Sequence, residues 1–401
     1  MAEQYEAFLS LWVDGEPIDD LEDRLRRVEV VERSRDASSF RILLSMAPSD
    51  TDASWPLLDD GRFQLMRRWT IAFGVGPYKS GEPDALSVVL DGYITSVEPY
   101  FGPDRVPDST LEIAGLDASC LMHFESRVRE WYDKSDAQIV REIYESYGFD
   151  CDISDTAPTR ARDRSSMLQR STDAEFVRML ARRNGCECFV EARDATVAKG
   201  SHPGRAIVAH FHRPRLDAKA QPALSLSPRA YPSLMSMRAS WQSHRPTSIV
   251  GHHLDPHSRK IQTATQDAPK LRKLGSQGRV DLLVPRLRGL ERGATLRPLG
   301  LQHERVPHDQ AELENFVFAA HLDNDWFVEA TGKVQGLRYE TILRPRRLVD
   351  IEAAGEQLDG PWYVRSAAHV WERNKATDSY EVDVELCRNA LGAGSGKAAS
   401  A

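Results

Sequence analysis

The chain has 401 residues, a formal net charge of -8 and 28% charged residues, as expected for a soluble globular protein of two or three domains at about 150 residues each. The negative charge argues against nucleic-acid binding by bulk electrostatics, and no apolar run reaches the roughly 18 residues of a membrane-spanning helix. We expect no secretory signal at the acidic N-terminus. Five cysteines, an odd number, predict a reducing compartment without a disulfide framework.

The first 118 residues predict a small β-barrel or sandwich. Alternating apolar and polar residues, separated by turn signals, mark strands at 5–13, 40–46, 67–76, 86–101 and 109–119. Several short strands at close spacing are typical of such folds.

The pattern then changes to a helical period. Residues 135–148 predict an amphipathic helix with Ser135 as N-cap and Gly148 just beyond its end. Strands follow at 186–192 and 205–212, so the region from 119 to 232 is predicted to be an α+β insertion.

A second helix is predicted directly before the first of these strands. Thr172 and Glu175 have the spacing of a capping box, and Gly185 stands where the helix ends. Phe176 and Leu180 belong to the apolar stripe and are predicted to pack this helix onto its sheet.

The second half of the chain returns to β structure. Residues 221–233 are rich in proline and predict a linker, 247–266 predict a hairpin with its turn near Asp255-Pro256, and 310–330 predict a helix. Residues 268–307 carry no clear pattern. The last strands are predicted at 346–355, 360–371 and 379–389, with Trp362, Tyr363 and Val364 as anchors of this β domain.

One phrase occurs in both halves. Asp91-Gly92 and Asp359-Gly360 each read as a turn before a run of β-branched and aromatic residues, followed by a polar loop and another strand. Chance similarity between β-hairpins is one explanation, and duplication of a barrel is the other. Duplication predicts a mainly β fold with α+β insertions, built on two tube-type β-barrels.

The corresponding domain organisation has six parts. They are a first barrel at 1–118, the α+β insertion at 119–232, the first part of the second barrel at 233–266, a second insertion with a helix at 267–334, the rest of the second barrel at 335–392 and a flexible tail at 393–401.

Two groups of histidines and one pair of cysteines are candidate metal ligands. Pro256 argues against a helix that would bring His253 and His257 together, so His252, His253 and His257 are interpreted as hairpin residues. The group His202, His210 and His212 is interpreted as surface or barrel-facing, although His210 and His212 share a strand face. Cys186 and Cys188 are interpreted as buried apolar side chains. We predict no metal, no cofactor and no catalytic residues.

Four stretches in sequence order resemble the phage late control protein D family, the hub part of VgrG-like spike proteins. They are QRSTDAEFVRMLARRNGCECFVE from Gln169, IVGHHLDPHSRKIQ from Ile249, GKVQGLRYETILRPRRLVDIEAAG from Gly332 and GPWYVRSAAHVWERNKATDSYEVDVELCRNALG from Gly360. The first contains the family's Gln-x-x-(Ser/Thr)-Asp-x-Glu-Phe segment. The N-terminal barrel is similar in pattern only.

The resemblance implies a structural hub of a contractile tail or injection system. The expected assembly is a homotrimer that forms a pseudo-six-fold ring, joins a hexameric inner tube to a trimeric spike on a separate chain, and contacts other baseplate proteins. Cargo effectors or DNA would pass through its lumen. Such a particle component is assembled in the bacterial cytoplasm.

Two other functions remain open at this stage. One is a cell-wall hydrolase, which requires two carboxylates held within about 10 Å in a cleft. The other is a carbohydrate-binding protein with exposed aromatic platforms. The basic stretches at 286–300 and 343–347 are interpreted as interface salt bridges rather than nucleic-acid contacts.

Overall fold

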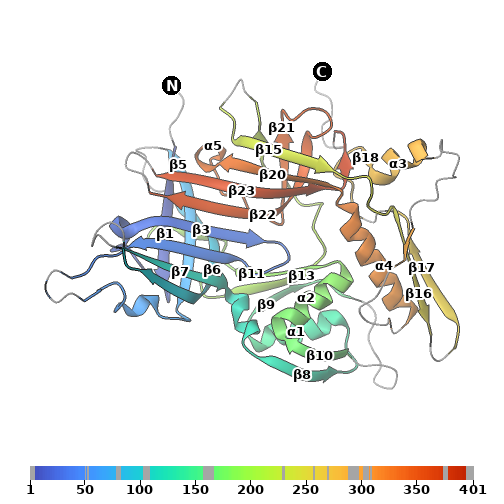
Figure 1. The fold of residues 1–401 in the computed structure, drawn as a ribbon, viewed down its shortest axis with the longest axis horizontal. Helices are drawn as coiled ribbons and strands as arrows, with labels where there is room; N and C mark the ends of the chain where they lie inside the picture. Colours follow the sequence, from blue (N-terminus) through green and yellow to red (C-terminus); the bar gives the residue numbers. More distant parts are fainter. Residues whose placement is uncertain are drawn as a thin grey trace.

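The computed structural model arranges the chain as one large sheet with two smaller units beneath it (Figure 1). It describes residues 5–49, 51, 54–77, 83–102, 109–156, 167–227, 231–255, 258–268, 271–287, 298–300, 307, 309–373 and 378–393. Of the predicted tail at 393–401, only residue 393 lies within these ranges. The turn residue Pro256 lies outside them. In the described part of the chain, no helix is long and apolar enough to cross a membrane.

The first half of the chain supplies seven strands of the large sheet. These are β1 (Tyr5–Val13), β2 (Glu16–Pro17), β3 (Leu25–Arg33), β4 (Ser39–Ser45), β5 (Arg68–Pro77), β6 (Ala85–Tyr100) and β7 (Thr110–Asp117). The 3-10 helices η1 (Glu22–Arg24) and η2 (Gly61–Phe63) lie before β3 and β5. The strands form because apolar residues alternate with polar ones, so that one face of each strand is buried.

The second half contributes six more strands. These are β14 (Gln221–Ser225), β15 (Leu234–Trp241), β20 (Val328–Gln335), β21 (Leu348–Glu352), β22 (Gly360–Glu372) and β23 (Ser379–Arg388). A fourteenth strand, β12 (Thr196–Ala198), pairs with β6. The linker predicted at 221–233 is therefore wrong in its first part, because β14 pairs with β21 through its backbone in spite of Pro222.

The two halves pair their strands in the same order. Across the sheet, the first half reads β3-β4-β7-β6-β5-β1 and the second reads β15-β20-β23-β22-β21-β14. Counted by chain order within each half, with the two-residue strand β2 left out, both read 2-3-6-5-4-1, which confirms the predicted internal duplication. The copies differ at their last strand, because β1 runs antiparallel to β5 whereas β14 runs parallel to β21.

Matching β-bulges set the register between the copies. β6 shifts its pairing with β7 between Ile94 and Ser96, and β22 shifts its pairing with β23 between Val364 and Ser366. Superimposing the bulges aligns Gly-Tyr-Ile-Thr-Ser at 92–96 with Trp-Tyr-Val-Arg-Ser at 362–366. This alignment differs by two residues from the one that the Asp-Gly phrases suggest.

Asp91 and Gly92 lie inside β6, so the turn predicted there is wrong. The buried carboxylate of Asp91 pairs with Arg68, whose Nε and Nη2 lie 2.6 Å from its two oxygens. A Cβ at Gly92 would lie 2.0 Å from the backbone oxygen of Leu116. Glycine is needed here because two backbones approach closely, not because the chain turns.

Asp359 does close a turn, because its backbone N–H donates to the carbonyl oxygen of Gly355, and Gly360 is the first residue of β22. The φ of Gly360 is +108°, a value that L-residues rarely adopt. Oδ1 of Asp359 accepts a hydrogen bond of 2.7 Å from the backbone N–H of Ala354. The same dipeptide therefore has two different structural roles.

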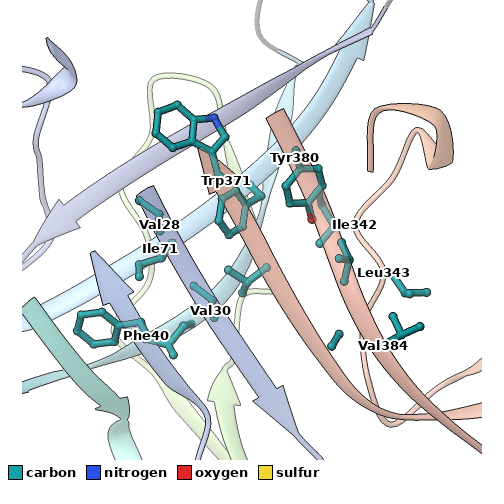
Figure 2. Packing of buried hydrophobic residues seen from close by; sticks show 14 of the residues in the cluster. Val28, Val30, Phe40, Ile71, Ile342, Leu343, Trp371, Tyr380 and Val384 are labelled. Atoms are coloured by element: carbon teal, nitrogen blue, oxygen red, sulfur yellow. The ribbon is translucent and has the colours of Figure 1, made fainter. Parts of the chain in front are cut away.

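The copies share one sheet and one hydrophobic core. β22 of the second copy pairs antiparallel with β3 of the first, so the pairing continues from one copy into the other. Figure 2 shows side chains of both copies in this core, with Val28, Phe40 and Ile71 on one side and Leu343 and Val384 on the other. The two predicted barrels are thus joined rather than separate, which the sequence did not predict.

The first insertion is an α+β unit between β7 and β14. Its elements are η3 (Ala118–His123), β8 (Ser126–Trp131), α1 (Asp136–Ser146), β9 (Asp150–Ile153), β10 (Met167–Thr172), α2 (Asp173–Asn184), β11 (Glu187–Ala192) and β13 (Ile207–His212). Both helices begin with a capping box, and Gly185 ends α2 with a φ of +63°. The helices cover one face of the sheet β11-β13-β9 (Figure 1).

The second insertion lies between β15 and β20. It contains β16 (Ser248–Leu254), β17 (Ile261–Gln266), β18 (Gln277–Gly278), α3 (Arg279–Leu287), β19 (Pro298–Gly300) and α4 (Gln310–Asp325), while α5 (Gly336–Tyr339) precedes β21 and β24 (Ala390–Leu391) pairs with β18. The predicted hairpin β16-β17 pairs with β19 and packs on α4, not on the large sheet. Assigning all of 233–266 to the second barrel therefore does not match where its strands pair.

Helix α4 is shorter than the predicted 310–330 and is buried on two sides. It ends at Asp325 because the chain enters β20 at Val328, with Trp326 and Phe327 already buried. One side packs on the hairpin, and the other meets α2, where a Cβ at Gly185 would lie 3.0 Å from Leu322. Gly185 thus both ends α2 and allows the approach of α4.

Candidate functional site at the junction of the sheet and the first insertion

The outer face of the large sheet is polar. Along β23, Val382 and Val384 are buried, whereas Asp383 and Glu385 are exposed. Basic side chains of neighbouring strands, including Lys333, lie with these carboxylates around a hollow of about 540 Å³. An antiparallel sheet with one apolar and one polar face is suited to separate a core from water.

This hollow does not support the hydrolase alternative. Asp383 and Glu385 both lie in it, but both are exposed, and Nζ of Lys333 lies 3.9 Å from Asp383. A glycosidase acid needs burial or a neighbouring carboxylate that raises its pKa. Exposed carboxylates beside a lysine do not provide such an acid.

The second face of the sheet β11-β13-β9 points toward the large sheet and is polar. We call it the junction face and define it by Glu187, Phe189, Glu191, His210, His212 and Asp152. It arises from strict alternation, since the residues between these, such as Cys188, Val190 and Phe211, pack under the helices. The insertion therefore presents mainly ionisable groups, with Phe189 among them, to the rest of the molecule.

A buried ionic network meets the junction face from the large sheet. Glu32 of β3, which is 1% exposed, lies at its centre. Its Oε1 accepts hydrogen bonds of 2.9 Å from Arg344 and 3.2 Å from Arg346, and its Oε2 lies 3.2 Å from Nε2 of His369. Nδ1 of His369 lies 2.8 Å from the hydroxyl of Tyr380. The network joins β3 of the first copy to three segments of the second.

Arg346 continues this network into the insertion. Its Nη2 also lies 3.0 Å from Oε2 of Glu191 on β11. Oε1 of Glu191 lies 3.2 Å from Nε2 of His210, and Nδ1 of His210 lies 3.0 Å from Oδ2 of Asp152. The exposed Arg215 donates to both oxygens of Asp152 at 2.8 Å. An unbroken chain of polar contacts thus runs from the sheet core to the solvent edge of the insertion.

The charges in this chain are stabilised by one another. Burial alone would raise the pKa of Glu32, but Arg344, His369 and Arg346 outweigh it and hold that pKa at about 2. The pKa of Glu191 is also held below its ordinary value, because His210, Arg346 and Arg344 outweigh its burial. Both carboxylates are therefore ionised at neutral pH inside the protein.

The six residues predicted to be structural anchors are all in the protein interior: Phe176, Leu180, Gly185, Trp362, Tyr363 and Val364. Phe176 and Leu180 lie in the insertion core, where the ring of Phe176 stacks on Trp131. Trp362 and Val364 lie in the core shared by the two copies. Tyr363 lies on the opposite face of β22 from Trp362 and Val364. It packs on Trp326, and its hydroxyl donates a hydrogen bond to Glu187 of the junction face. The sequence predicted that Trp362, Tyr363 and Val364 all anchor one barrel. Alternate residues of a strand face opposite sides, so Tyr363 does not share the core of the other two.

The candidate metal ligands have separate environments. His202 contacts the backbone oxygen of Gly15, and His252 contacts Thr263, so neither joins another histidine. His257 lies outside the described residues. Cys186 and Cys188 are buried in the insertion core, and burial raises the pKa of each to about 12. His210 and His212 do come together, on the junction face with Asp152.

The sequence interpretation missed Glu32 and misplaced two arginines. Arg344 and Arg346 were expected at interfaces between chains, but both are buried and pair within the chain. The stretch at 286–300 lies mostly outside the described residues. A usable signal existed for Glu32, because it shares the inward face of β3 with Val28 and Val30. A carboxylate at an inward strand position predicts a buried partner of opposite charge.

One family profile matches part of the sequence. The profile of a family described as the Alg8 N-terminal domain matches residues 87–211, which run from β6 to β13 and make up 125 of the 401 residues. None of the curated proteins matches the sequence.

Comparison with solved structures is more informative. The chain is similar to the tail protein from Neisseria meningitidis MC58, with a TM-score of 0.62, 11% identity and coverage of 96% of this chain and 97% of that one. It is similar to the 43 kDa tail protein of prophage MuSo2 from Shewanella oneidensis, with a TM-score of 0.57, 13% identity and coverage of 96% and 100%.

A third similar structure is the E. coli c3393 protein, described as a type VI secretion system component with structural similarity to the T4 bacteriophage tail proteins gp27 and gp5. The TM-score is 0.53, the identity is 12%, and the match covers 97% of this chain and 79% of that one. These likenesses show that the chain has the mainly β fold of phage tail and baseplate-like proteins.

Proposed function

We propose that the protein is a non-enzymatic structural hub in the baseplate of a phage tail or a related injection system. Three chains form a ring. Each chain contributes its two copies of the strand motif, so the ring has six similar surfaces. The ring seats a hexameric inner tube on one side and a trimeric spike on the other, and other baseplate proteins bind around it. It is assembled in the bacterial cytoplasm and carried in the particle.

The repeated strand order is the observation that carries this proposal. Two copies with the order 2-3-6-5-4-1 lie in one continuous sheet, so their relative orientation is fixed by backbone pairing between β22 and β3. A rigid pair of similar units, repeated three times around an axis, matches six-fold symmetry to three-fold symmetry. Closed rings are a usual outcome when identical subunits repeat one contact.

The surface of the sheet supports the same role. The polar face of β23 and its neighbours is suited to line a water-filled passage for DNA or a cargo effector. Strand β15 is at an edge of the sheet, and it exposes Met235 by 48% and Trp241 by 52%. An edge strand with exposed apolar side chains readily pairs with another chain. We therefore assign β15 to the contact between protomers.

The test is the mass of the assembly and its partners. Light scattering should give three times 45.1 kDa, and electron microscopy should show a ring that binds the inner-tube protein of the same particle. Met235→Glu with Trp241→Glu should give monomers. Val128→Glu, which alters a side chain that is 81% exposed on β8 of the insertion, should leave the trimer intact.

A protein that is monomeric and does not bind the inner-tube protein would overturn the proposal. Hydrolysis of cell-wall glycan, or saturable binding of a sugar, would favour one of the two alternatives instead.

A further inference from the structure

Three ligand-bearing side chains converge on the junction face. Asp152, His210 and His212 each offer one atom, and these atoms all lie within 4.8 Å of one another. Nδ1 of His210 is 3.0 Å and Nε2 of His212 is 3.9 Å from Oδ2 of Asp152. Ligands about 2.0–2.2 Å from a four-coordinate zinc ion are separated by similar distances.

The strand register creates this cluster. His210 pairs directly with Asp152 across the parallel strands β13 and β9, and His212 follows two residues later on the same face. Because all three side chains belong to paired strands, their spacing is fixed by backbone hydrogen bonds. A site on strands is held more rigidly than one on loops.

The remaining ring nitrogens are held by acceptors. Nε2 of His210 lies 3.2 Å from the carboxylate of Glu191, and Nδ1 of His212 lies 2.9 Å from the backbone oxygen of Arg213. A cation bound to Nδ1 of His210 would replace the contact of that nitrogen with Asp152, while the outer nitrogens keep facing Glu191 and the carbonyl of Arg213. Metal-binding histidines are oriented in this way by a carboxylate or a carbonyl behind the ring.

The ring of His210 is fixed further by stacking. The ring of Phe189 stacks on the ring of His210, with centroids 4.3 Å apart. The guanidinium of Arg346 lies 4.1 Å from the centroid of the Phe189 ring. His210 is 9% exposed and His212 is 5% exposed. Both imidazoles are therefore held in place beside one carboxylate.

We propose that Asp152, His210 and His212 bind a divalent transition-metal cation, with zinc as the reference ion. Two imidazoles and a carboxylate suit such an ion and leave a coordination position open toward solvent. The bound ion ties β9 to β13 and replaces the guanidinium of Arg215, which is more than half exposed and free to swing away from Asp152. This site does not depend on the proposed hub function.

The test uses the full chain after dialysis against a chelator. Titration calorimetry should show one Zn²⁺ per chain, and Co²⁺ should give the visible absorption of a nitrogen and oxygen site of low coordination number. His212→Asn should weaken binding by at least about 100-fold, and Glu191→Gln by roughly 10–100-fold through loss of ring orientation. Arg215→Gln should tighten binding, because it removes the competing cation. His252→Asn, on the separate hairpin, should leave binding unchanged.

Three results would overturn the proposal. The first is no Zn²⁺ binding by the wild-type chain, which needs no variant to be interpreted. The second is a sulfur-to-cobalt charge-transfer band, which would place the ion on cysteines. The third is a nitrogen NMR spectrum in which His210 stays an imidazolium between Asp152 and Glu191 when Zn²⁺ is added.

Discussion

Each copy of the strand motif has one fully buried tryptophan, but the two lie on different strands of the equivalent pair. In the first copy, Trp69 of β5 lies opposite Gly92 of β6, and in the second, Val349 of β21 lies opposite Trp362 of β22. Both indoles are fully buried, and each donates its N–H to a backbone carbonyl. The duplicated fold has therefore kept a buried indole in this strand pair but not the strand that carries it, as tolerated in a core that is repacked around a large side chain.

The largest expected effect tests whether the two tryptophans have equivalent roles. Trp69→Ala and Trp362→Ala should each lower the free energy of unfolding by about 3–5 kcal/mol, because each leaves a cavity in the shared core. Denaturant unfolding measures both. Val128→Ala, at the exposed position on β8, should stay within about 0.5 kcal/mol. A loss below about 1 kcal/mol for only one buried tryptophan would show that the copies do not share a core in solution.

The next effect tests how the copies are coupled. Glu32→Gln leaves Arg344 and Arg346 with too little negative charge, and breaking a buried ion pair costs about 3–5 kcal/mol, of which we expect the lower end. Calorimetry should then show two transitions in place of one, since Glu32 joins the first copy to the second. Glu29→Gln, on the exposed side of the same strand, should change stability by less than about 1 kcal/mol.

The same network predicts a pH dependence. The pKa of Glu32 is about 2 in the folded protein, below its ordinary value of 4.5, so its charge stabilises the fold above pH 4.5. That stabilisation is lost as the pH falls from 4.5 toward 2. The stability difference between wild type and Glu32→Gln should therefore shrink over this range, and a constant difference down to pH 2 would contradict the assignment.

A smaller effect separates the two Asp-Gly phrases. Asp91→Ala removes the partner of Arg68 from a buried position and should cost about 2–3 kcal/mol, less than a fully buried pair because Arg68 is partly exposed. Asp359→Ala removes one turn hydrogen bond and should cost about 1 kcal/mol. Equal losses in unfolding experiments would mean that both aspartates have the same role, as the sequence first suggested.

The smallest effect concerns the bulge residues that the two copies have in common. Arg365→Ala removes an ion pair of 3.5 Å with Glu329 in which both side chains are more than one-third exposed, so it should cost under about 1 kcal/mol. Thr95→Ala, at the equivalent exposed position, should be within about 0.5 kcal/mol. A large loss at either site would show that the bulge depends on its side chain and not on backbone pairing.

Local signals in the sequence predicted local structure well. The capping box of Thr172 and Glu175, the end of α2 at Gly185 and the hairpin of β16 and β17 are where the sequence placed them. These features depend on contacts between residues that are close in the chain. The period of two also predicted which strands exist, because burial of one face imposes it.

The junction could not be predicted in this way. Glu32, Glu191, Arg346 and His369 come from four distant segments, and nothing in the local pattern of any one of them identifies its partners. The proposed cation site has the same origin. The sequence showed that His210 and His212 share a face, but only the parallel pairing of β9 with β13 adds Asp152.

By itself, the sequence determined that the chain is mainly β, that a similar strand phrase occurs in both halves, and that an α+β unit lies between them. The tertiary structure decided that the copies share one sheet and core, that Asp91-Gly92 lies within a strand, and that the charged residues of the two copies and the insertion meet at one junction. The physical reason is range: alternation and capping act over a few residues, whereas the pairing of β22 with β3 joins residues that are more than 300 positions apart.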